Sequence, residues 1–194
     1  MTTFGEKTAL IVVDMQNDFA DPAGSLSVTG GEALVGMVNG EIIRAAAVGA
    51  MVVYTQDWHP KSTPHFAKDG GIWPVHCVAD TWGAEFHPRL IVAGPTVPKG
   101  TNGEDGYSGF TMRDPKTGAV TPTGLAGLLR EREIRRVVVV GLALDYCVKA
   151  TALDSREEGW HTSVPLHLTA PVNLEPHHGE EAVAMLRAAD VLVA

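Results

Sequence analysis

Apolar residues along this chain form short unbroken runs that alternate with longer stretches of helical periodicity. The short runs predict β-strands at Thr8–Val13, Met51–Thr55, Pro95–Pro98, Val137–Gly141, Thr162–Leu168 and Val191–Val193. Apolar spacings of three and four predict helices at Glu32–Val48, Leu125–Glu133, Asp145–Glu158 and Gly179–Ala189. The valines at 137–140 show no polar alternation, which is expected of a parallel strand that is buried on both faces.

Strand followed by helix is the order of βαβ units, and it predicts an α/β fold with a mainly parallel sheet. Right-handed crossovers then place helices on both faces of that sheet. No internal repeat or linker interrupts the pattern, and a chain of 194 residues has the usual length of one domain. We therefore expect a single domain over residues 1–194.

The stretch from Asp57 to about Arg89 breaks the alternation. It is rich in proline, histidine, glycine and tryptophan, and it has no sustained period. A loop of this length inside a compact domain is uncommon and usually functional. Ligands of parallel sheets bind beyond the carboxyl ends of the strands. Asp14, Lys99 and the segment Ala143–Cys147 also follow predicted strands, so we expect them to meet Asp57 at one rim of the sheet.

Composition and charge exclude several classes of protein. Hydrophobic residues make up 45% and charged residues 20%, which is ordinary for globular proteins and excludes disorder and collagen-like repeats. The net charge is −8, and no basic run is longer than Arg135–Arg136, which disfavours nucleic acid and anionic membranes as partners. No apolar stretch approaches the ~18 residues of a membrane span.

The cysteine content and the N-terminal residues bear on the compartment. Residues 1–7 lack the charged-then-apolar layout of a signal peptide. Cys77 and Cys147 are the two cysteines, and without a secretion signal we expect both to be free thiols in a reducing cytoplasm.

Cys147 is the first candidate for chemistry. It follows the valine strand and falls in the first turn of a predicted helix, with Asp145 as the expected N-cap. The partial positive charge at a helix N-terminus favours a thiolate. The alternative is a buried thiol in the core, because cysteine is commonly buried. Cys77 has no such setting, and we interpret it as packing.

Asp14 and Lys99 are the next candidates. A carboxylate at the end of an apolar strand needs a partner or a raised pKa, so Asp14 could be a general base; it could equally cap the turn that follows. A single lysine is normally a solvated surface cation. Beside Asp14, however, Lys99 would hold that carboxylate ionised and oriented.

A group of histidines accompanies Asp57. Asp57 and His59 lie two residues apart, so they point the same way in an extended chain, and His65 and His76 follow within the long loop. One carboxylate with two or three imidazoles suits Zn, Fe or Mn. The alternative is a set of exposed loop histidines. The glycine-rich stretch Gly100–Gly109 is predicted to be a flexible loop over the rim.

Seven segments together resemble the isochorismatase-like cysteine hydrolases, and within them the nicotinamidase (pyrazinamidase) branch. They are Ala9–Phe19, Gln56–Pro60, Trp73–Val78, Phe86–Pro88, Pro98–Gly100, Tyr107–Phe110 and Gly141–Val148. No single segment is specific, but the combination in this order is. The resemblance implies a three-layer α/β/α fold with a parallel sheet. Isochorismatases proper lack the Asp-x-His and His metal set, so their branch is disfavoured.

The resemblance also assigns roles to residues. It implies that Cys147 is the nucleophile, Asp14 the general base and Lys99 its partner. The implied metal ligands are Asp57, His59 and His76, while His65 matches an extra histidine that only some members have. The aromatic residues that match positions sandwiching a pyridine ring are Phe19, Trp73 and Tyr107. The implied oxyanion hole is made by the backbone N–H groups of Ala143 and Cys147, with a cis peptide bond between Leu142 and Ala143.

The activity that the resemblance implies is hydrolysis of nicotinamide, and of pyrazinamide, to the acid and ammonia through a thioester, as a step of NAD salvage. It needs one divalent metal ion, Zn or Fe/Mn. We expect a small carboxamide as the partner, without nucleic acid or membrane, and a homo-oligomer is left open. Two rival functions stay open as well. One is another amidase of this fold acting on carbamoyl or ureido groups, and the other is a non-catalytic ligand-binding relative.

Overall fold

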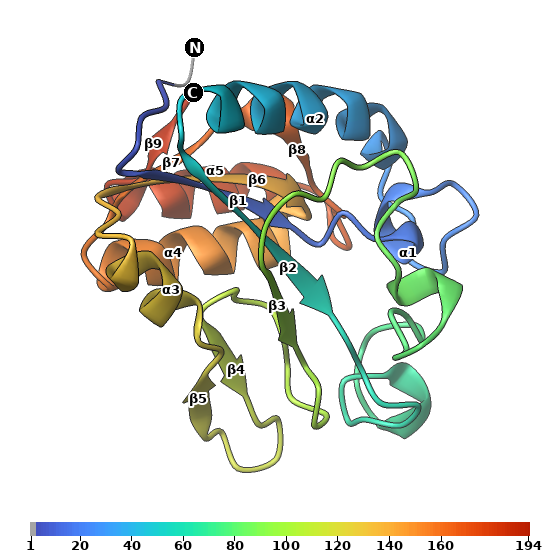
Figure 1. Cartoon of the computed structure of the whole chain (residues 1–194). Helices are drawn as coiled ribbons and strands as arrows, with labels where there is room; N and C mark the ends of the chain where they lie inside the picture. The colour runs from blue at the N-terminus through green and yellow to red at the C-terminus, as the bar shows by residue number, and fades with distance from the viewer. Residues whose placement is uncertain (1–2) are drawn as a thin grey trace.

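The computed structural model describes residues 3–194 and is built around a twisted seven-stranded sheet (Figure 1). The strand order is β3-β2-β1-β6-β7-β9, and β8 pairs with β6. All pairs in this sheet are parallel. The strands are β1 (Thr8–Val13), β2 (Met51–Asp57), β3 (Thr96–Lys99), β6 (Arg136–Leu142), β7 (His161–Val164), β8 (Thr169–Ala170) and β9 (Leu192–Val193).

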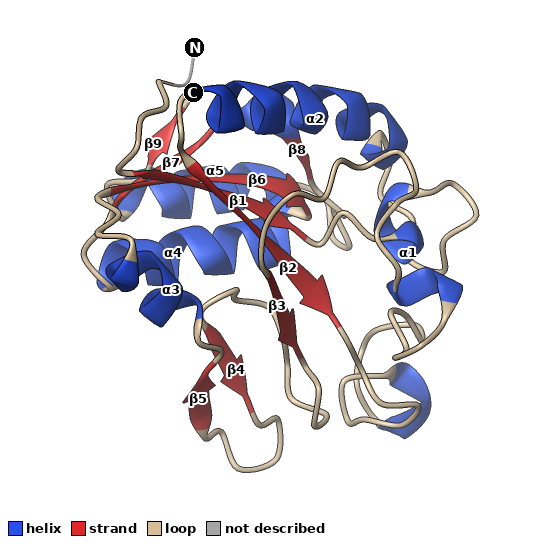
Figure 2. Cartoon of the chain, viewed as in Figure 1, coloured by secondary structure: helices blue, strands red, loops and turns tan. Residues whose placement is uncertain are grey.

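Helices cover both faces of the sheet, which makes three layers (Figure 2). The helix α2 (Gly31–Ala47) lies on one face, and the other face carries α3 (Leu125–Glu131), α4 (Lys149–Glu157) and α5 (His178–Ala188). Leu10 and Val12 of β1 belong to the apolar cluster under α2, whereas Ala9, Ile11 and Val13 belong to the cluster under the other three helices. The α/β/α prediction is confirmed.

The central position of β1 explains its unbroken apolar run. All six of its residues are buried, because β2 and β6 flank it and helices cover it on both sides. The parallel register brings the carboxyl ends of the neighbouring strands level: Val13 pairs with Thr55 and Gly141, and Asp57 pairs with Lys99. The residues that follow these strands therefore lie along one rim, as the sequence predicts.

One strand prediction is confirmed only in its first part. Thr162–Leu168 was expected to be a strand, but β7 ends at Val164 and Leu166–Leu168 is a 3-10 helix. Pro165 stands at the break, where its fixed φ and missing N–H favour a turn over continued pairing. Pairing with the same neighbour, β6, then resumes at β8.

Several short elements carry no clear sequence signal. The long loop after β2 contains the 3-10 helices Ala67–Asp69 and Trp82–Ala84. The helix α1 (Asn17–Ala20) follows β1, and β4 (Thr111–Arg113) pairs antiparallel with β5 (Val120–Pro122) as a separate hairpin. Among the described residues, no helix is both long enough and apolar enough to cross a membrane.

Candidate active site

Cys147 lies in a π-helical turn, Leu144–Val148, that connects β6 to α4. Its thiol is buried at the carboxyl end of the sheet. The expected N-cap is wrong: Ala143 occupies the cap position, and Asp145 lies within the first turn. The carboxylate of Asp145 instead accepts the N–H groups of Val172 and Asn173, so it ties the turn to the segment that follows β8.

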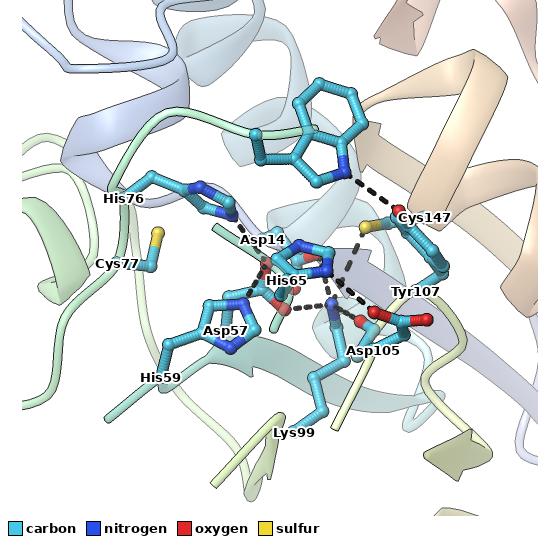
Figure 3. A network of polar contacts seen from close by, with 12 residues as sticks. Asp14, Asp57, His59, His65, His76, Cys77, Lys99, Asp105, Tyr107 and Cys147 are labelled. Atoms are coloured by element: carbon cyan, nitrogen blue, oxygen red, sulfur yellow. Dashed lines mark hydrogen bonds and ion pairs between the residues drawn. The ribbon is translucent and has the colours of Figure 1, made fainter. Parts of the chain in front are cut away.

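Lys99 is the centre of a buried network of polar contacts (Figure 3). Its Nζ lies 2.7 Å from Oδ2 of Asp14 and 3.6 Å from Sγ of Cys147. The same ammonium donates to Oδ1 of Asp57 and to the carbonyl oxygen of Gly106. Lys99 and Asp14 are each fully buried, so the solvated-lysine alternative does not hold here. Three segments far apart in sequence thus place a carboxylate, a cation and a thiol together.

The electrostatics of this network leave a neutral thiol beside a carboxylate. Burial raises the pKa of Asp14 to about 6, although the charge of Lys99 and a hydrogen bond from Thr55 oppose the rise. Burial would lower the pKa of Lys99, but Asp14 and Asp57 hold it well above its usual value. Burial also raises the pKa of Cys147 well above that of a free thiol. The helix terminus therefore does not produce a resting thiolate, and a base is needed.

A cluster of three buried histidines lies next to this network. His59, His65 and His76 each contribute one ring nitrogen, and these three nitrogens lie within 4.8 Å of one another. Oδ2 of Asp57 is 3.6 Å from Nε2 of His59 and 3.8 Å from Nε2 of His76. Asp57 therefore connects the two groups, because its Oδ1 faces Lys99 and its Oδ2 faces the histidines.

The donor atoms in this cluster fit a metal ion. Both ring nitrogens of His59 are buried without a hydrogen-bond partner, which is costly unless another ligand satisfies them. Nδ1 of His76 bonds to the carbonyl oxygen of Pro74 at 2.8 Å, which leaves its Nε2 for the cluster. Burial lowers the pKa of His76 to about 4, so this ring is neutral at pH 7, as a metal ligand must be.

An aromatic pocket opens beside both groups. Phe19, Trp73 and Tyr107, which the family resemblance implies as ring-binding residues, line it, and Nε1 of Trp73 donates to the hydroxyl of Tyr107 at 2.8 Å. Cys147 and His76 also line the pocket. Flat apolar walls with a thiol and imidazoles among the lining residues suit a small aromatic ligand that carries a polar group.

The peptide bond between Leu142 and Ala143 is cis, as predicted. Both residues line the pocket next to Cys147. The use of the Ala143 and Cys147 N–H groups as an oxyanion hole stays a prediction.

Sequence reasoning missed four residues of the site. Tyr146 lines the pocket, Thr55 donates to Asp14 at 2.7 Å, and the carboxylate of Asp105 contacts His65. The side-chain amide of Gln16 bonds to both the N–H and the carbonyl of Asp57. A signal existed for Gln16 and Tyr146, which lie beside Asp14 and Cys147 in sequence. None existed for Asp105, because its partner is 40 residues away.

The chain is similar to several known proteins in sequence and in fold. Residues 8–193 match the family described as "Isochorismatase domain". The nicotinamidase/pyrazinamidase of Mycobacterium tuberculosis is 40% identical over 86% of this chain and 88% of its own. The pyrazinamidase of Pyrococcus horikoshii, solved in complex with zinc, has a TM-score of 0.85 at 35% identity, covering 97% of this chain and 98% of its own. PnC1 from L. infantum, solved in complex with nicotinate, has a TM-score of 0.88 at 38% identity, covering 100% of this chain and 95% of its own.

Proposed function

The chain belongs to the isochorismatase family, and we propose that it is a metal-dependent nicotinamidase that hydrolyses nicotinamide and pyrazinamide to the acid and ammonia. One observation carries the proposal above all. The buried thiol of Cys147, beside Asp14 and Lys99, lines the same aromatic pocket as His65 and His76 of the histidine cluster.

Catalysis begins with the thiol of Cys147 in its neutral state. Asp14 is ionised at pH 7, because its pKa is about 6, and it takes the proton from Sγ as the thiolate attacks the carboxamide carbon. Lys99 keeps the base oriented and offsets the negative charge that passes to sulfur. The N–H groups of Ala143 and Cys147 are proposed to hold the oxygen of the tetrahedral intermediate.

The intermediate then collapses by breaking its carbon–nitrogen bond. Protonated Asp14 returns its proton to the leaving nitrogen, which departs as ammonia and leaves a thioester on Cys147. Water attacks the thioester carbon with Asp14 again as the base. The carbon–sulfur bond breaks, nicotinic acid is released, and Asp14 returns the proton to Sγ, which regenerates the thiol.

A divalent metal ion, Zn or Fe/Mn, would be held by Asp57, His59 and His76, with His65 as a further donor. When bound, it would anchor the ring nitrogen of the substrate and so fix the carboxamide next to Sγ. Phe19, Trp73 and Tyr107 would hold the faces of the ring. The zinc complex of the Pyrococcus relative supports a divalent metal ion as the cofactor.

The proposal also includes the cellular compartment and the use of the product. Both cysteines are free thiols, which supports a reducing cytoplasm. The acid that the reaction releases would be consumed in NAD salvage.

Ammonia release tests the proposal directly. The purified protein is assayed with nicotinamide, pyrazinamide and an N-carbamoyl amino acid, each with and without a chelator. We expect turnover of the two aromatic carboxamides, loss of that turnover after chelation, and recovery on adding Zn²⁺ or Mn²⁺. Turnover of the carbamoyl compound alone would instead support the rival amidase, and no turnover at all would support a binding protein.

A further inference from the structure

The loop that follows β3 sends a carboxylate into the histidine cluster. Figure 3 shows the contact between Asp105 and His65, in which Oδ1 of Asp105 lies 2.8 Å from Nδ1 of His65. His65 is buried, and the Asp105 side chain is only 16% exposed. The ring of His65 stacks on that of His59, with centroids 4.9 Å apart, and lies 5.5 Å from that of His76. The contact with Asp105 is thus on the outer side of a crowded group of rings.

This contact decides which nitrogen of His65 is available. A carboxylate only accepts hydrogen bonds, so Nδ1 of His65 carries the hydrogen that Asp105 receives. In the neutral ring, Nε2 then has a free lone pair, which is what a metal ligand needs. In His76, the carbonyl oxygen of Pro74 takes the place of the carboxylate: it contacts Nδ1, so Nε2 is the nitrogen left for a metal.

Asp105 is itself held firmly by the hairpin. Its N–H donates to the carbonyl oxygen of Arg113 at 2.7 Å, and its carbonyl accepts from the Arg113 N–H at 3.2 Å, so it pairs with the first strand of that hairpin, β4. The next residue, Gly106, accepts from Lys99, and Tyr107 accepts from Trp73. A carboxylate on such an anchored backbone can fix the ring that it contacts.

We propose that Asp105 is a positioning residue of the metal site, which fixes the tautomer and orientation of His65 so that Nε2 of His65 is a metal donor. The inference rests on the metal site of the proposed function and deepens it. It also gives the hairpin of β4 and β5 a role, because its pairing with Asp105 keeps this carboxylate in place.

Zinc affinity of the full chain tests the proposal without any substrate. Zn²⁺ is withdrawn from the loaded protein by a competing chelator of known affinity, for wild type, Asp105→Ala, Asp105→Asn and Glu104→Ala. We expect Asp105→Ala to bind zinc ~10–100-fold more weakly. Asp105→Asn should lose less, because its amide oxygen can still accept from Nδ1. Glu104→Ala is the matched control: this neighbouring carboxylate binds the Asn102 N–H and should not change the affinity.

A double-mutant cycle separates this role from a general loss of structure. In a His65→Ala background, Asp105→Ala should cause no further loss, since Asp105 acts through His65. The proposal is overturned if Asp105→Ala binds zinc within twofold of wild type, or if its effect persists without His65. A wild type that binds no zinc overturns it too. A protein that binds zinc in this pattern but does not hydrolyse nicotinamide would leave the inference standing and remove the proposed function.

A spectroscopic measurement on the wild type covers the case in which Asp105→Ala does not fold. Nitrogen NMR of the histidine rings reports which nitrogen carries the hydrogen. We expect His65 in the metal-free protein to be protonated at Nδ1 and bare at Nε2, with the Nε2 signal moving on zinc addition. Protonation at Nε2, or an Nε2 signal that zinc leaves unmoved, would contradict the proposal.

Discussion

Cys147 carries the proposed chemistry, and the molecule offers a second buried thiol for comparison. Both cysteines are free and buried, and burial raises both pKa values, but only Cys147 contacts Lys99. Replacing Cys147 by alanine should lower kcat by roughly 10³-fold or more while the fold and substrate binding persist. Single-turnover mass spectrometry of the wild type should find an acyl adduct on this residue.

Cys77→Ala is the control for that experiment. The Cys77 side chain lies 3.8 Å from the carbonyl of Gly83 and touches no reacting group, so its loss should affect stability more than turnover. Residual activity of Cys147→Ala within tenfold of wild type would remove the nucleophile assignment.

The acid side of the pH profile should report Asp14. This carboxyl has a pKa raised to about 6 by burial, and the mechanism needs its ionised form. The value of kcat/KM should therefore be constant above about pH 7 and fall about tenfold for each pH unit below pH 6. Initial rates at low substrate concentration across pH 4.5 to 8 measure it. A flat profile down to pH 4.5 would argue against Asp14 as the base.

Thr55 gives a sharper version of the same test. Its hydroxyl donates to Oδ1 of Asp14 at 2.7 Å, and this hydrogen bond lowers the pKa of the carboxyl. Removing the donor in Thr55→Val, a change of nearly equal volume, should raise that pKa and move the acid limb of kcat/KM upward by about one pH unit. An unmoved limb would show that another group controls it.

At the scale of elements, the junction between β6 and the π-helical turn depends on Gly141. Its φ is 106°, and a Cβ there would overlap the backbone carbonyl of Val13 in the neighbouring strand. Gly141→Ala should therefore destabilise the protein by roughly 2–4 kcal/mol in urea unfolding. It should also reduce turnover, because this junction aims Cys147.

Gly36 provides the matched glycine for that comparison. It lies within α2 with open space around it, so Gly36→Ala should stabilise the protein by roughly 0.5–1 kcal/mol through helix propensity. Equal effects of the two substitutions would contradict the account of the junction.

For the whole molecule, metal removal should be visible in stability as well as activity. The histidine cluster lies on the long loop after β2, and Asp57 ends that strand, so an ion there would join the loop to the sheet. At a metal concentration of about 100 times Kd, binding stabilises by ~2.7 kcal/mol, which corresponds to a Tm increase of roughly 5–10 °C at this size.

Calorimetry with and without chelator measures this difference, and elemental analysis should find about one equivalent of metal per chain. His59→Ala should abolish the difference, since this residue is an expected metal ligand and both of its ring nitrogens are buried without a hydrogen-bond partner. An identical Tm with and without chelator would speak against a metal at this place.

The sequence alone determined the fold class and the edge of the sheet at which the site lies. Buried parallel strands need apolar residues on both faces, so β1 and β6 are visible as unbroken runs, and the parallel topology brings Asp14, Asp57, Lys99 and Cys147 to one rim. The spacing of Asp57 and the loop histidines pointed to a metal site, and the family motifs pointed to the pocket aromatics. Local signals of this kind depend only on neighbouring residues.

Only the tertiary structure decided what those residues experience. Burial raises the pKa values of Asp14 and Cys147, and for Cys147 this desolvation disfavours the resting thiolate that its place at a helix start suggested. The contact of Asp105 with His65 joins residues 40 apart, and Pro165 diverted a strand that its apolar neighbours favoured. Such effects depend on which groups the fold brings together and on how completely it excludes water. A local stretch of sequence determines neither the contacts nor the burial.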